Sequence, residues 1–119
     1  MHAKTFMQDP GSPRRVRRWI ADVLPGCDGD AVARVQLLAS ELVTNSLVHA
    51  RSDVEVTITR SDARLSVEVQ DASDAAPVRR SVPLDSTTGR GIWLVDTLSD
   101  EWGVRVADHA KTVWFELDL

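Results

Sequence analysis

The hydrophobic residues of this chain change their spacing near residue 53, and this change restricts the folds that the chain can adopt. Upstream, apolar residues recur at the i, i+3, i+4, i+7 spacing of an amphipathic helix, as in Val16, Trp19, Ile20, Val23 and Leu24. A second, longer helix is predicted from a cap at Asp28 or Asp30 to about Ala50. Downstream, apolar and polar residues alternate over 53–60 and 64–71, which predicts an antiparallel hairpin.

Four further elements complete the predicted order. They are a short strand over 3–8, a helix over 89–98, and strands over 101–106 and 111–117. Residues 72–88 have no sustained period, which predicts a long loop of the kind that often serves as a functional lid. The order β-α-α-β-β-loop-α-β-β predicts an α+β fold. We expect a two-layer α/β sandwich, with three helices covering one face of a mixed, mostly antiparallel sheet of four or five strands.

Length and composition exclude several classes of protein. At 119 residues, positions 1–119 are expected to form a single domain with a real hydrophobic core. No apolar run approaches the roughly 20 residues that cross a bilayer, so no membrane association is expected. The net charge of −4 argues against direct nucleic-acid binding. One cysteine and no secretion signal predict a cytoplasmic protein.

Three polar residues recur every fourth position in the second predicted helix. Glu41, Asn45 and His49 therefore share one helix face. The neutral amide oxygen of Asn45 suits a hard cation such as Mg²⁺. Glu41, one turn earlier, is placed to polarise a hydroxyl or a water. Spacing alone leaves a plain solvated helix face as an alternative, because polar pairs at i, i+4 are common.

A carboxylate ends the second strand of the predicted hairpin. Counting by twos from Leu65 places the side chain of Asp71 on the core face. A buried carboxylate is costly unless a group donates to it, and the exocyclic amine of a nucleobase would serve. The alternative is an aspartate at the strand end that is frayed into solvent or caps the following turn.

Two glycines lie where the long loop leads into the third helix. In Thr87-Thr88-Gly89-Arg90-Gly91, backbone N–H groups can approach an anion closely, and the helix N-terminus adds partial positive charge. A simple turn into a helix is the alternative. Taken together, the three features predict a nucleotide pocket in which Asp71 holds the base, Asn45 the metal, and Gly89, Arg90 and Gly91 the phosphates.

These motifs, in their order and spacing, resemble a known family. The segments that carry the likeness are 41–50, Asp71, 88–95 and 111–117. They resemble the ATP-binding domain shared by gyrase, heat-shock chaperones and histidine kinases, known as the Bergerat or GHKL fold. More narrowly, the chain is similar to stand-alone bacterial anti-sigma factor kinases.

The resemblance implies a role for each matching residue. Glu41 would be the general base that activates the attacking hydroxyl, and Asn45 would bind the Mg²⁺ that bridges the ATP phosphates. Asp71 would accept a hydrogen bond from the adenine amine, and Gly89 to Gly91 would line the phosphates. His49 is a motif position that we group with the cofactor-binding residues.

The resemblance also implies partners. The phosphate acceptor would be a serine on an anti-sigma factor antagonist of the STAS type, and a sigma factor would be a second partner. Arg15 lies near the position of a partner-contacting arginine, and homodimers are expected for the family. A solvated face is the alternative for residues 14–18, although four arginines at a helix start oppose the helix dipole.

The chain departs from the family pattern at two places. The family's Asp-x-Gly-x-Gly box reads Asp71-Ala-Ser73-Asp-Ala75, without either glycine, and Ala110-Lys111 stands where a Gly-Thr pair is usual. The leading hypothesis is an ATP-binding anti-sigma factor with serine kinase activity. The alternative is a non-catalytic partner-binding module with weak or no ATP binding.

Overall fold

The computed structural model describes residues 1–50, 52–72 and 87–119, with residues 87–91 described as backbone only. The elements follow the predicted order closely. They are β1 (His2–Phe6), α1 (Ser12–Val23), α2 (Gly29–Asn45), a π-helical turn η1 (Ser46–Ala50), β2 (Val54–Arg60), β3 (Arg64–Asp71), α3 (Thr87–Leu98), β4 (Glu101–Ala107) and β5 (Ala110–Asp118). None of these helices is long and apolar enough to cross a membrane.

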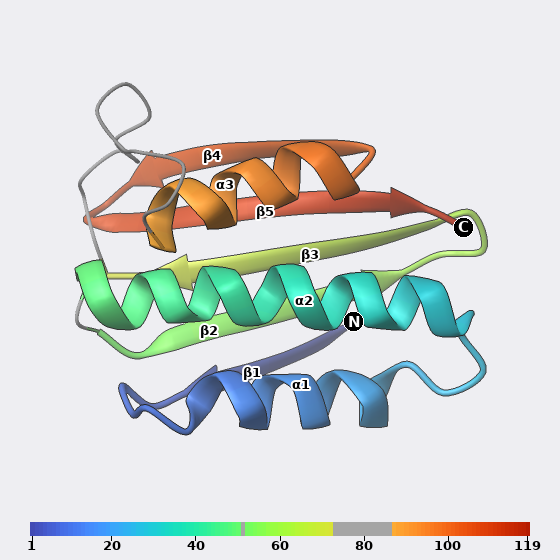
Figure 1. The fold of residues 1–119 in the computed structure, drawn as a ribbon, viewed down its shortest axis with the longest axis horizontal. Coiled ribbons are helices and arrows are strands. Elements are labelled where there is room, and N and C mark those ends of the chain that lie inside the picture. The colour runs from blue at the N-terminus through green and yellow to red at the C-terminus, as the bar shows by residue number, and fades with distance from the viewer. Residues whose placement is uncertain (51, 73–86) are drawn as a thin grey trace.

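The five strands form one sheet in the order β1-β2-β3-β5-β4. The three α-helices lie on one face of this sheet, which confirms the predicted two-layer α+β fold (Figure 1). Every pairing between neighbouring strands is antiparallel, so the predicted mixed character is wrong for the described strands. The reason is topological. The connection through α3 carries the chain past β3 to the sheet edge, and β5 then returns between β3 and β4.

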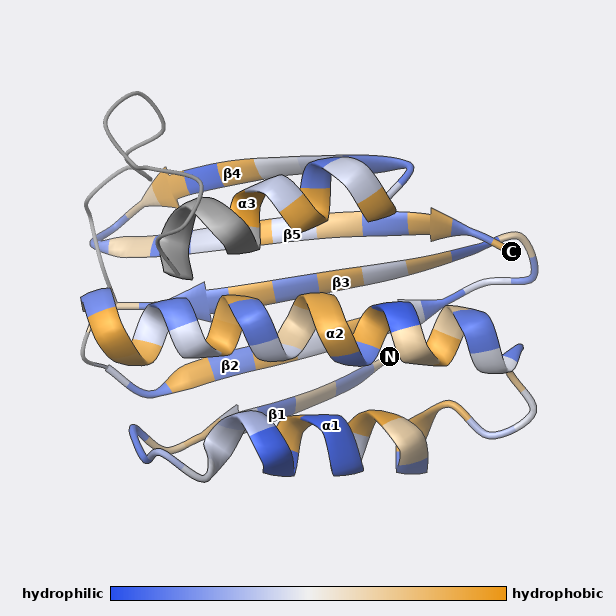
Figure 2. Ribbon diagram, in the orientation of Figure 1, coloured by the Kyte–Doolittle hydropathy of each residue, from blue (hydrophilic) through white to orange (hydrophobic). Residues whose placement is uncertain are grey.

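The core lies between the sheet and the helices. Hydrophobic and hydrophilic residues alternate along β2 and β3 (Figure 2), as a sheet with one covered face requires. The buried apolar strand residues are Phe6, Val54, Val56, Ile58, Leu65, Val67, Val69, Val113, Phe115 and Leu117. The buried helix residues that meet them are Val16, Ile20, Val35, Leu38, Ala39, Leu42, Val43 and Val95.

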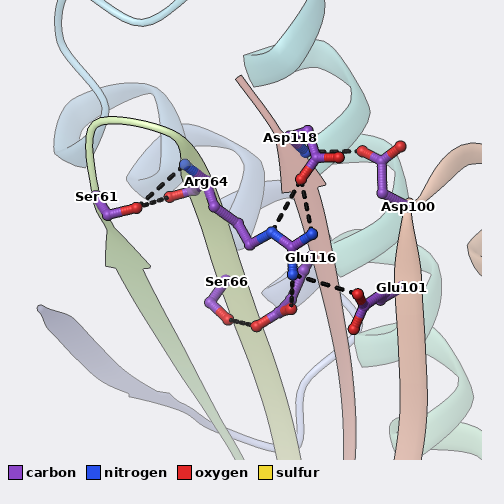
Figure 3. A network of polar contacts seen from close by, with 7 residues as sticks. All are labelled: Ser61, Arg64, Ser66, Asp100, Glu101, Glu116 and Asp118. Atoms are coloured by element: carbon purple, nitrogen blue, oxygen red, sulfur yellow. Dashed lines mark hydrogen bonds and ion pairs between the residues drawn. The ribbon is translucent and has the colours of Figure 1, made fainter.

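A charged network joins β3, β4 and β5 at one end of the sheet (Figure 3). Arg64 donates to Asp118 Oδ1 at 2.9 Å and to Glu116 Oε1 at 2.6 Å, and its Nη1 lies 3.5 Å from Glu101 Oε1. Ser66 Oγ donates to the second Glu116 oxygen at 2.7 Å. The hydrogen bond to Asp118 and the nearby carboxylates raise the pKa of Arg64. Asp71 lies at the opposite end of β3 from this network.

The close approach of two β-strands at Gly103 gives a test of the packing. A Cβ atom on Gly103 would lie 2.7 Å from Cζ2 of Trp114, its cross-strand partner. Gly103→Ala should therefore displace the indole and lower the free energy of unfolding by about 1–3 kcal/mol. Urea denaturation measures this. Gly29→Ala is the control, because a Cβ there meets no heavy atom within 4 Å. Equal stability of the two variants would contradict the packing.

Candidate functional site

Helix α2 positions the first two residues of the predicted polar line. Asp28 caps the helix, with its Oδ2 accepting from the backbone N–H of Ala31 at 3.3 Å. The apolar side of α2 is buried against the sheet, which fixes the rotation of the helix about its axis. Glu41 and Asn45 therefore lie one turn apart, with Glu41 half-buried and Asn45 buried.

The amide oxygen of Asn45 is the most informative atom of the site. Asn45 is 7% exposed, and its Oδ1 has no hydrogen-bond partner among the described residues. A buried acceptor without a partner costs about 1–3 kcal/mol, so such atoms call for an explanation such as a ligand. A neutral oxygen of this kind fits Mg²⁺, which is commonly held by one or two protein oxygens together with substrate phosphates. The chemistry of Asn45 therefore fits the predicted metal.

The helix changes character directly after Asn45. The prediction of a continuous helix to about Ala50 is wrong in its last turn, because residues Ser46–Ala50 form the π-helical turn η1. Single π-helical turns are rare in proteins, but those that occur are often found at functional sites. His49 lies in this turn and is exposed, whereas Asn45 is buried. The structure thus places Glu41 and Asn45 in one partly buried row and leaves His49 at the surface.

The carboxylate of Asp71 is buried on the core face, as its place in the alternation predicts. Its side chain is 1% exposed, so the alternative of a solvated strand end is wrong. Ser46 Oγ donates to Asp71 Oδ2 at 2.6 Å, and Lys111 Nζ lies 3.7 Å from the same oxygen. Lys111 is the cross-strand partner of Asp71 in the pairing of β3 with β5. One hydroxyl and one ammonium group therefore meet this buried charge.

Sequence reasoning assigned no role to Ser46 or Lys111. Ser46 directly follows Asn45, and a small polar residue at that place in a helix is an ordinary surface choice. Its burial and its contact with Asp71 depend on how α2 is laid on the sheet, which the sequence pattern does not show. For Lys111 a signal existed, because this lysine stands at the start of the final strand where the family usually has a Gly-Thr pair, but its register opposite Asp71 was not predictable.

The backbone of Gly89, Arg90 and Gly91 lies in the first turns of α3, which begins two residues earlier than predicted. Helix α3 packs beside α2. The N-terminal end of α3, the C-terminal end of α2 and the end of β3 lie at the same end of the molecule (Figure 1). The side chains of these three residues, and residues 73–86 of the predicted loop, lie outside the described residues. The fold thus gathers the three predicted features at one end.

Arg15 lies on the exposed side of α1, far along the chain from the other site residues. Its Nη2 is 3.1 Å from Asp9 Oδ2, and it also donates to Ser12 Oγ at 3.1 Å. The backbone N–H of Gly11 and the Arg15 guanidinium hold the pKa of Asp9 below its ordinary value. Arg14, Arg17 and Arg18 are exposed as well, so α1 presents a basic surface.

Comparison with known proteins identifies the family. Residues 6–117 match the histidine kinase-like ATPase domain, and the chain belongs to this family. Its fold is similar to that in the crystal structure of the RsbU and RsbW domains of Rv1364c from Mycobacterium tuberculosis, with a TM-score of 0.74 and 16% sequence identity. That match covers 98% of this chain and 32% of the mycobacterial chain, so this chain spans about a third of its length. No curated protein matches the sequence.

The Ser46–Asp71 hydrogen bond gives a test of the site's geometry. Ser46→Ala removes a donor from a buried carboxylate and should lower the free energy of unfolding by about 1–3 kcal/mol, measured by urea denaturation. Ser40→Ala is the control, because Ser40 is also buried but its Oγ donates to Leu37 O in its own helix. A Ser46 variant no less stable than the Ser40 variant would refute the role of this hydrogen bond.

Proposed function

We propose that this chain is an ATP-binding regulatory protein, an anti-sigma factor that phosphorylates a serine on an anti-sigma factor antagonist. The single observation that carries the proposal is the buried Asn45 Oδ1, which lacks a partner among the described residues and lies one turn after Glu41. Membership of the histidine kinase-like ATPase family supports the nucleotide. The RsbW domain named in the similar mycobacterial structure supports the regulatory class.

Each residue then has a chemical task. Asn45 would give a neutral oxygen ligand to Mg²⁺, and the bound ion would neutralise charge on the ATP phosphates. Asp71 would orient the adenine ring by accepting a hydrogen bond from its amine. The N-terminus of α3, with Gly89, Arg90 and Gly91, would place backbone N–H groups against the phosphates. His49 would lie at the rim of the site, where it is exposed.

The reaction requires an acceptor hydroxyl to lose its proton. Glu41 is half-buried on the same helix row as Asn45, which suits a carboxylate that takes the proton from the serine hydroxyl as phosphorus is attacked. Positioning and electrostatic stabilisation together supply almost all of the catalysis in phosphoryl transfer, since the protein does little covalent chemistry. A rigid helix that carries base and metal ligand one turn apart supplies such positioning.

The partners would approach the basic surface of α1. Arg15 and its exposed neighbours on α1 would meet acidic groups on the antagonist, a sigma factor or both. The Asp9 carboxylate holds the Arg15 guanidinium beside the helix start before a partner binds. A homodimer and a cytoplasmic location belong to the same proposal.

A second candidate function rests on a specific observation. Ser46 and Lys111 already engage the Asp71 carboxylate within the chain. A site whose base-binding group is satisfied internally would bind ATP weakly, and the missing glycines after Asp71 point the same way. In that case the chain is a partner-binding module without kinase activity.

The metal assignment is tested with Asn45→Ala. Without the amide oxygen, the dissociation constant for ATP should rise at least tenfold in the presence of Mg²⁺ and stay unchanged in EDTA. Titration followed by tryptophan emission measures this, since Trp93 is half exposed in α3. Thr44→Val is the control on the same helix. An unchanged Mg²⁺ dependence would remove Asn45 as ligand, and absent binding of millimolar MgATP to the native protein would favour the partner-binding module.

The general base is tested with Glu41→Gln. The variant should bind MgATP within about twofold of the native protein but transfer phosphate roughly 10²–10⁴-fold more slowly. The assay follows radiolabelled γ-phosphate from ATP into a purified antagonist protein of the STAS type. Glu55→Gln, an exposed change on β2, is the matched control. Transfer at the native rate by the Glu41 variant would refute the assignment.

A further inference from the structure

Lys111 lies half-buried beside Asp71, the carboxylate that the proposed function assigns to the nucleobase. It is one of only two lysines in the chain. Its side chain is 15% exposed, and its Nζ lies 3.7 Å from Asp71 Oδ2. The pairing of β3 with β5 sets Asp71 and Lys111 directly opposite each other, so the strand register holds the two groups together.

The Lys111 ammonium supplies the charge that balances Asp71, whereas the Ser46 hydroxyl supplies the close hydrogen bond. Burying an ammonium group is costly, and Ser46 Oγ already donates to Asp71 Oδ2 at 2.6 Å. The distance of 3.7 Å from Nζ to Oδ2 exceeds hydrogen-bond range. The two groups therefore form an ion pair without a direct hydrogen bond from Nζ to Oδ2. A lysine ammonium has three N–H donors and no acceptor. Lys111 therefore brings donor capacity to a site where Asp71 is the acceptor.

We propose that Lys111 recognises the nucleobase together with Asp71, a step that rests on the proposed binding of ATP. The edge of adenine carries the 6-amino donor next to the N1 acceptor. Asp71 accepts from the amine, and Lys111 donates to N1. Two adjacent groups of opposite hydrogen-bonding character thus meet two adjacent groups on the base. This contact also gives a function to a half-buried lysine in the final strand.

The test compares ATP with 1-deaza-ATP, in which a C–H group replaces N1. The native protein with Mg²⁺ should bind ATP about tenfold more tightly than the analogue, because the analogue leaves the ammonium without its acceptor. Lys111→Met should bind both nucleotides alike. Lys111→Arg, which keeps the charge and the donors, should retain a preference for ATP. Calorimetric titration gives the dissociation constants.

Lys4→Met is the matched control, since it removes the only other lysine from an exposed place on β1. It should discriminate as the native protein does. Equal affinities of the native protein for ATP and 1-deaza-ATP would overturn the role of Lys111 while leaving ATP binding intact. This comparison needs no variant, so it can overturn the role of Lys111 even where Lys111→Met does not fold. Failure of the native protein to bind either nucleotide would overturn the proposed function, and with it this inference.

Discussion

The hydrogen bond from Ser46 Oγ to Asp71 Oδ2 is the contact on which the candidate site depends. It joins the end of α2 to the end of β3, two elements that meet only because the helices lie on the sheet. Both groups are buried, so the bond is made away from water and its loss would remove a close donor from a buried charge. Asn45 precedes Ser46 directly, and the contact therefore holds the proposed metal ligand close to the proposed base-binding carboxylate.

The charged groups at the two ends of the sheet differ in their exposure to water. At one end, Arg64 joins β3, β4 and β5 through carboxylates that are accessible to water, and these contacts hold strand ends together. At the other end, Asp71 is buried and its partners include a hydroxyl and an ammonium group. Exposed ion pairs contribute little individually, whereas a buried carboxylate constrains its surroundings strongly. The end that carries the proposed site is the one where polar groups are buried.

Sequence patterns predicted the elements better than their arrangement. The bounds of β3 agree with the prediction because strict alternation marks both ends of that strand. The continuous helix to Ala50 failed at Ser46, where a tertiary contact and a π-helical turn replace the regular ladder. Asp71 was placed correctly on the core face, since alternation alone decides that. The spacing of Asn45 and His49 did not predict that the first is buried and the second exposed. Spacing shows that two residues share a helix face, but not how deeply each one is buried.

The sequence by itself determined the order of helices and strands, the face on which Asp71 lies, and the family to which the motifs belong. These follow from local periodicity and from residues at short, regular spacings. The tertiary structure alone decided the strand order, the register that sets Lys111 opposite Asp71, and the burial of the Asn45 oxygen. The physical reason is that these properties arise from contacts between distant segments, which depend on how the layers pack and leave no periodic trace along the chain.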